Sequence, residues 1–238
     1  MRFTYFLFLT QTLYSLQLPT FDRGFEFYYP AEISAYGEVR PKIIEYAYAN
    51  KCSLLAQELS RGANPSKLYD NDQPYYGFTP LGGAIYANCF GCVKKLLEAG
   101  ALVNGYYSVP LWFEKINNKH DWRKYNARNS HPLAVAICQN ADLRIIRILI
   151  EYGADVNLGH DFLDEPLNKT SLTPLMLAVI MNNKEAFKLL LQAGADPDIK
   201  NDIDNLSAKD YVSMYDVLHA RRSSFKKDFS SLLEKYKK

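Results

Sequence analysis

Residues 173–198 read "TPLMLAVIMNNKEAFKLLLQAGADPD", and this stretch decides the fold. Thr173 is a residue type that caps helices, and Pro174 suits the first helical position because it lacks an N–H donor. Asn182 predicts a turn after a short helix, and Gly194 predicts the left-handed end of a second helix. That second helix carries apolar residues at i, i+3 and i+4 spacing, namely Phe187, Leu190 and Leu191. The stretch therefore predicts a helix–turn–helix unit.

The same unit recurs along the chain. Four copies occupy residues 41–65, 79–104, 131–157 and 173–198, and a truncated fifth copy begins at Leu206. The distance from cap to terminal glycine is 21 positions both from Thr79 to Gly100 and from Thr173 to Gly194. A single unit cannot bury its apolar face, so successive units are expected to stack around one continuous core.

The three clearest copies carry the motif of a known family. The other two read "TPLGGAIYANCFGCVKKLLEAGALVN" (79–104) and "HPLAVAICQNADLRIIRILIEYGADVN" (131–157). This pattern resembles the ankyrin repeat family, and it implies an all-α solenoid of about five helix-turn-helix units with long hairpin insertions. The family usually has a histidine after Thr-Pro-Leu, where this chain has Gly82, Ala134 and Met176. His131 also replaces a capping threonine, which is expected to weaken capping without changing the fold.

The two ends of the chain have their own patterns. Residues 1–15 begin with Arg2 and a short apolar run, which predicts a signal peptide cut before Leu16. The alternative is that this run is a buried capping element. Residues 16–40 are expected to cap the first unit. Residues 207–238 are expected to form a C-terminal capping repeat whose second helix is long and basic, with Arg221, Arg222, Lys226 and Lys227.

Three insertions, at residues 66–78, 105–130 and 158–172, interrupt the repeats, and all of them fall between a glycine and the next cap. This connection takes about 12 residues in a regular 33-residue repeat. Because stacking places equivalent connections side by side, the insertions are expected to be neighbours. The second is basic and the third acidic, so they could pair with each other for ~0–1 kcal/mol per exposed pair, or bind a dipolar partner.

The insertions are rich in aromatic residues, which are candidate binding anchors. The candidates are Tyr75, Tyr76, Tyr106, Tyr107, Trp112, Phe113, Trp122, Arg123 and Phe162. Ser108 with Pro110 is expected to start a short helix that places Trp112 beside Ile116. Asp121 is expected to cap a second turn that places Trp122 beside Tyr125. Both tryptophans either pack on their own repeat or face a partner.

The family resemblance implies a second surface. The position seven residues after the cap is variable in ankyrin repeats and faces the concave side. Here that position is apolar in every unit, and the stripe consists of Tyr48, Tyr86, Cys138 and Ile180, with Met181 beside the last. An apolar stripe needs a cover, which is either the long insertion or a partner protein.

Motifs for catalysis or metal binding are not found in the sequence. Cys89 and Cys92 have redox-motif spacing, but Cys92 falls on a core position and the thioredoxin-like context is missing. A disulfide between Cys52 and Cys89 is favoured instead, and zinc lacks further ligands at suitable spacing. The four histidines are scattered, at positions 120, 131, 160 and 219. We therefore expect no enzyme activity, no metal and no cofactor.

Composition narrows the partner class. A formal charge of +2, spread along the chain, gives no case for nucleic acid, and beyond residue 15 no window is long and apolar enough for a membrane span. The expectation is a monomeric, non-catalytic protein-binding module that is exported to a bacterial periplasm or secreted, where it acts as an immunity-like or accessory protein. The alternatives are an effector-type adaptor acting on host proteins in a host cell or cytoplasm, and an enzyme with a site in the insertions around His120 or His160.

Overall fold

The structure is a computed structural model that describes residues 42–66, 79–105, 107–110, 126–163, 169–202, 205–219 and 228–236. Within these ranges, residues 107–110, 126–130, 160–163, 169–171, 215–219 and 228 are described by backbone only. All of them belong to one compact unit, Arg40–Lys238. The predictions for the signal peptide (1–15) and the N-terminal capping segment (16–40) lie outside the described residues.

The described residues form ten helices arranged as five successive pairs. The first helix of each pair is α2 (Lys42–Tyr48), α4 (Pro80–Tyr86), α6 (Pro132–Cys138), α8 (Pro174–Ile180) or α10 (Ala208–His219). The second is α3 (Cys52–Ser60), α5 (Phe90–Glu98), α7 (Leu143–Glu151), α9 (Lys184–Gln192) or α11 (Asp228–Lys235). The predicted all-α solenoid of about five helix-turn-helix units is confirmed.

Local chemistry sets the boundaries of the helices. The Thr79 hydroxyl accepts a hydrogen bond from the Gly82 N–H at 3.1 Å at the start of α4, and Thr173 caps α8 in the same way. His131 occupies the equivalent position before α6 but makes no capping hydrogen bond to its first turn. The second helices end at glycines with φ between 85° and 90°, which are Gly62, Gly100, Gly153 and Gly194. Asparagines with positive φ form the turns inside the units, at Asn50, Asn88, Asn140 and Asn182.

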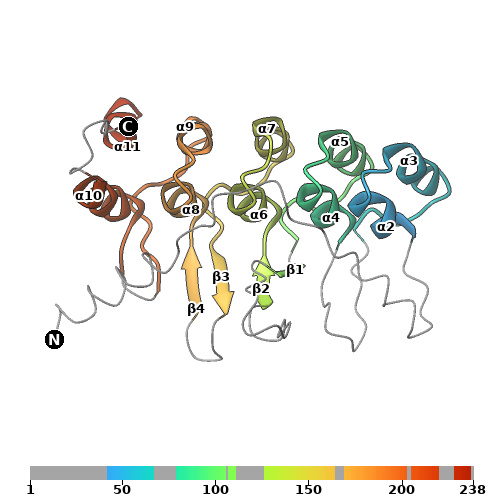
Figure 1. Ribbon diagram of the computed structural model, residues 1–238, viewed down its shortest axis with the longest axis horizontal. Coiled ribbons are helices and arrows are strands. Elements are labelled where there is room, and N and C mark those ends of the chain that lie inside the picture. The colour runs from blue at the N-terminus through green and yellow to red at the C-terminus, as the bar shows by residue number, and fades with distance from the viewer. Residues whose placement is uncertain are drawn as a thin grey trace. The chain divides into compact units, whose positions relative to one another are not determined.

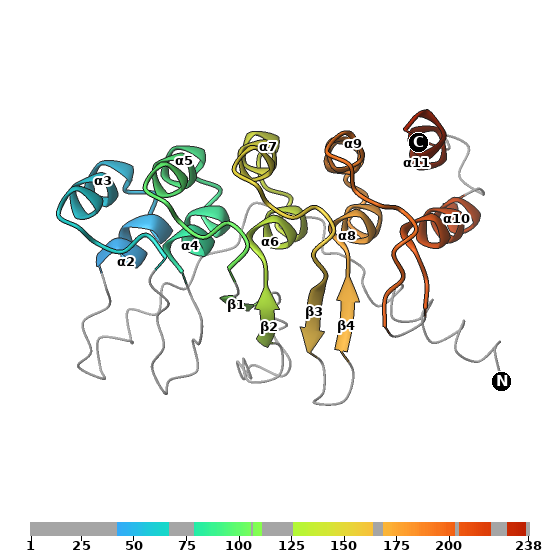
Figure 2. The ribbon, with the colours of Figure 1, turned by 180° about the vertical axis from the view of Figure 1, so that it is seen from behind.

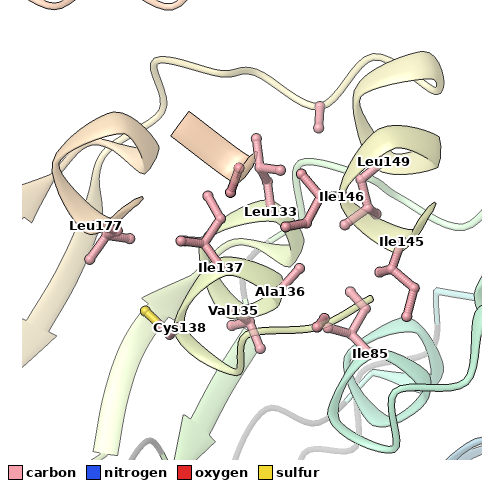
Figure 3. Packing of buried hydrophobic residues seen from close by; sticks show 14 of the residues in the cluster. Ile85, Leu133, Val135, Ala136, Ile137, Cys138, Ile145, Ile146, Leu149 and Leu177 are labelled. Atoms are coloured by element: carbon pink, nitrogen blue, oxygen red, sulfur yellow. The ribbon is translucent and has the colours of Figure 1, made fainter. Parts of the chain in front are cut away.

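The pairs stack in chain order. Each first helix contacts the first helix of the next unit, and each second helix contacts the next second helix, so two layers form (Figures 1 and 2). Between the layers lies one apolar core, and its central part is drawn in Figure 3. There α6 and α7 contribute side chains that are at most 2% exposed, namely Leu133, Ile137, Ile145, Ile146 and Leu149. Burying each such side chain stabilises the fold by about 1.5–3 kcal/mol.

Asparagine side chains connect neighbouring units. Asn104 donates from Nδ2 to the Gly153 carbonyl at 2.9 Å, and its Oδ1 accepts from the Asp155 N–H at 2.8 Å. Asn157 repeats part of this link one unit later by accepting from the Asp196 N–H. These bonds satisfy backbone groups in the turns, and they fix the offset between successive units.

Two of the three insertions begin and end in paired strands. Strand β1 (Tyr107–Pro110) pairs antiparallel with β2 (Asn126–Ser130), and β3 (His160–Leu163) pairs antiparallel with β4 (Lys169–Leu172). Strands β2 and β3 contact each other, so the second and third insertions are neighbours, as expected. The expected helix start at Ser108 and Pro110 is wrong, because backbone pairing with β2 holds this segment as a strand.

The last unit is anchored by aromatic and capping contacts. Phe187 of α9 and Phe229 of α11 pack edge to face with ring centroids 5.0 Å apart. At the start of α10, Asp210 of the first turn accepts hydrogen bonds from both the hydroxyl and the N–H of Ser207, at 2.6 and 2.8 Å. Among the described residues α10 has 12 residues and α11 has 8. The long basic second helix that the sequence predicts falls in part on residues 220–227, outside the described residues, and stays a prediction. The four basic residues expected on it lie outside the described residues.

Candidate protein-interaction surface

The apolar stripe falls on equivalent positions of the stack. Tyr48, Tyr86, Cys138 and Ile180 are the last residues of α2, α4, α6 and α8. These four helices contact one another in order, so the stripe crosses successive units on the layer of short helices. The hairpins extend from this same layer, on the side away from the second helices (Figures 1 and 2). The stripe and the hairpins therefore belong to one side of the helical stack.

Two tyrosines form one end of the stripe. The Tyr48 and Tyr86 rings are tilted by 43°, with centroids 5.5 Å apart, and both side chains are half-buried. Burial raises the pKa of Tyr86 above its usual 10.0, so its phenol stays protonated at neutral pH. Gly83 makes the arrangement possible, because a Cβ at this position would lie 2.6 Å from Tyr48 Cδ2.

The rest of the stripe is unequal in exposure. Cys138 is only 9% exposed, and burial raises the pKa of its thiol to about 12. Ile180 and Met181 are half-buried and lie at the end of α8. The stripe thus offers two partly exposed apolar ends, the tyrosine pair and the Ile180–Met181 pair. Cys138 between them contributes to the core.

Most of the predicted anchors in the insertions lie outside the described residues. These are Tyr75, Tyr76, Tyr106, Trp112, Phe113, Trp122 and Arg123. Tyr107 lies in β1 and Phe162 in β3, where the backbone alone is described. The choice between a lid over the stripe and a contact surface therefore stays a prediction.

Three cysteines converge where the first two units meet. The disulfide joins Cys52 of α3 to Cys92 of α5, so the predicted pairing of Cys52 with Cys89 is wrong. Cys89 Sγ nevertheless lies 3.0 Å from Cys52 Sγ, and it accepts the Cys92 N–H at 3.1 Å. Both Cys89 and Cys92 are thus close enough to pair with Cys52. The separation of the cysteines along the chain could not show which of the two does so. The spacing of Cys89 and Cys92 places both at the start of α5, so both sulfurs can face α3.

The comparisons with known proteins agree with this geometry. Residues 104–201 match a family model for ankyrin repeats, in three copies. The helix pairs α6–α7 and α8–α9 lie within this match.

The units within residues 104–201 are ankyrin repeats.

Similar ankyrin repeat proteins come from different kinds of organism. The chain is 26% identical over 193 residues to an ankyrin repeat protein of Acanthamoeba polyphaga mimivirus, which covers 77% of this chain and 31% of that protein. It is 30% identical over 145 residues to Ankyrin repeat and SOCS box protein 5 of Bos taurus, covering 60% and 34%. It is 28% identical over 160 residues to an ankyrin repeat protein of Rickettsia felis, covering 63% and 56%.

These matches show the repeat architecture, and each covers only part of the related protein. The chain spans about a third of the length of the viral and bovine relatives. Ankyrin repeats are protein–protein interaction modules, so the stripe and hairpins are candidate contacts for a partner protein. Among the helices that the structure describes, none is long and apolar enough to cross a bilayer.

Proposed function

We propose that this ankyrin-repeat chain is a non-catalytic module that binds a partner protein. Its contact surface consists of the two exposed ends of the stripe together with the aromatic insertions. The observation that carries the proposal is the repeated placement of an apolar side chain at the end of every short helix from α2 to α8. Core packing explains Cys138 but leaves Tyr48, Tyr86, Ile180 and Met181 partly exposed.

Partly exposed aromatic and aliphatic residues on a rigid helix layer are the usual anchors of protein interfaces. Tyrosine brings a large contact area with few rotatable bonds, so it loses little entropy on binding. Such an anchor typically contributes about 2 kcal/mol or more when a partner covers it. The insertions beside the layer can add contacts to those of the helices.

Substitutions on the stripe test this proposal. The variant Ile180→Asp places a charge at one exposed end, and Tyr152→Asp is the matched control because Tyr152 is 44% exposed in the turn after α7, outside the stripe. Partners are captured from the cells that produce the protein, and their affinity for purified wild type and variants is measured by titration calorimetry. We expect at least about tenfold weaker binding for Ile180→Asp and no change for Tyr152→Asp. Equal loss in both variants would reject the stripe as the contact surface.

The insertion anchors need a separate variant. In Trp112→Ala/Trp122→Ala both tryptophans of the chain are removed. If the insertion contacts the partner, the double variant binds more weakly while its helix content and melting temperature stay unchanged. If the tryptophans instead pack on their own repeat, the melting temperature falls.

We also propose that the module acts after export, as an immunity-like or accessory protein. The apolar run in residues 1–15 supports export, and so does the Cys52–Cys92 disulfide, which suits an oxidising compartment. The alternative is an effector-type adaptor acting on host proteins. The mass of the mature N-terminus separates the two, since export predicts a chain beginning at Leu16 and an intact Met1 contradicts cleavage.

A further inference from the structure

The cluster of Cys52, Cys89 and Cys92 contains one sulfur more than its disulfide uses. All three sulfurs lie within 4.8 Å of one another, although Cys52 comes from the first unit and the other two from the second. We propose that, once the disulfide is reduced, these three sulfurs bind a single thiophilic d10 metal ion, Cu⁺ or Zn²⁺, between the first and second repeats.

The geometry suits such an ion. Zinc–thiolate bonds are about 2.3 Å long, so sulfurs sharing one ion lie about 3.8 Å apart. Small rotations of the three side chains from their present spacing reach this distance. Gly91 lies beside Cys52, since a Cβ on Gly91 would be in van der Waals contact with Cys52 Sγ at 3.4 Å.

Comparison between the repeats supports a role for Cys89 beyond capping. The residue before the second helix is Asp142 in the third unit and Asn183 in the fourth, and each caps its helix with an oxygen. Cys89 holds this position before α5 and caps it with sulfur, which is a weaker acceptor. Sulfur at this position makes a weaker cap than oxygen would, and metal ligation would explain why a cysteine is found here.

Backbone groups around the sulfurs offset part of the cost of ionising buried thiols. Cys52 is the first residue of α3 and Cys89 precedes α5, so both sulfurs lie at the positive ends of helix dipoles. The Cys92 N–H that points at Cys89 Sγ stabilises a negative sulfur further. Cys89 is 5% exposed and Cys92 0% exposed, while Cys52 is half-buried, so water could reach the ion from the Cys52 side. Burial by itself raises the pKa of the Cys89 thiol, and a metal ion reverses that preference for the protonated form.

The coordination number separates the two ions. Within the described residues, the cluster offers three ligand atoms from cysteine, histidine and acidic side chains. Three sulfurs complete a trigonal Cu⁺ site, whereas Zn²⁺ needs a fourth ligand such as solvent. A thiol or phosphine reductant supplies two electrons and two protons to break the Cys52–Cys92 bond into two thiols. Metal binding then releases the thiol protons to solvent.

Titration of the reduced full-length protein under oxygen-free conditions tests the proposal. Co²⁺ serves as the spectroscopic probe for a zinc-type site, and Cu⁺ is added as its acetonitrile complex in a parallel arm. We expect a sulfur-to-metal charge-transfer band in the near ultraviolet and one ion per chain by native mass spectrometry. The arm with the tighter binding identifies the preferred ion.

Cysteine variants decide whether the cluster is the site. Cys52→Ser and Cys89→Ser are expected to weaken binding by at least about tenfold, whereas Cys138→Ser, which removes a buried thiol outside the cluster, binds as wild type. Circular dichroism checks that each variant is folded. The proposal would be overturned if the wild type formed no one-to-one complex with either ion, or if Cys52→Ser bound the ion as tightly as wild type. The cluster would then be a structural disulfide with a nearby thiol that has no role in binding.

Discussion

Gly83 is the residue on which the tyrosine end of the stripe depends. Glycine inside a helix normally costs about 1 kcal/mol relative to alanine, so Gly83→Ala would stabilise an unconstrained helix. Here the new Cβ would lie 2.6 Å from Tyr48 Cδ2, close to the fixed part of the ring. We expect Gly83→Ala to lower the free energy of unfolding by about 1–3 kcal/mol, measured by denaturant titration.

A second substitution identifies the cause. Adding Tyr48→Ala to Gly83→Ala removes the ring that the Cβ would meet, so the alanine at position 83 no longer costs stability in that background. If Gly83→Ala is equally destabilising with and without Tyr48, the close approach is not the reason for the glycine.

At the scale of elements, the cap of α10 predicts a pH dependence. Hydrogen bonds from Ser207 hold the pKa of Asp210 below its usual 3.8. Because the folded-state pKa is lowered, this stabilisation is complete above the unfolded pKa of about 3.9 and is lost as pH falls through the folded value. At pH 7 the free energy of unfolding of Asp210→Ala is expected to be about 1 kcal/mol lower than that of wild type. This difference in free energy is expected to shrink in acid.

Thermal or urea unfolding at several pH values measures this difference. Glu234→Ala, an exposed acidic residue of α11, is the control and should show no such narrowing. A constant difference between wild type and Asp210→Ala down to acid pH would mean that the carboxylate does not act through its charge.

Helix boundaries could be predicted from the sequence, whereas strand pairing could not. The start of α4 at Thr79 and the end of α5 at Gly100 were predicted because capping and left-handed glycines are local effects. Strand β1 was mistaken for a helix start because its conformation depends on β2, whose pairing residues lie 16 or more positions away. The strands lie in insertions outside the repeat motif, so that motif carries no information about their pairing.

At the scale of the whole molecule, the stack couples its units mainly to their neighbours. The Cys52–Cys92 disulfide adds a covalent link between the first two units, across a separation of 40 residues. Reduction with a metal chelator present is expected to lower the protection of α2 and α3 against hydrogen exchange by up to about 2–4 kcal/mol. The protection of α8 and α9 is expected to stay unchanged, and a uniform loss across all helices would contradict nearest-neighbour coupling.

The order of the units followed from the repeats, while the cysteine pairing did not. Repeat spacing predicted which helices would be neighbours, but the sequence favoured Cys89 as the partner of Cys52 and gave Cys92 a core position. The pairing with Cys92 depends on the rotation of α5 against α3, which side-chain packing sets. The same limit applies to the stripe, where Cys138 has the expected position but lies too deep to meet a partner.

The link made by Asn104 has a consequence for the ageing of the protein. Asn104 precedes Gly105, and asparagine followed by glycine deamidates when its side chain is free to be attacked by the next backbone nitrogen. Its amide is held by Gly153 and Asp155 of the next unit, so the reaction must wait until this interface opens. The rate at which aspartate or isoaspartate appears at position 104 would therefore report how often the second and third repeats separate.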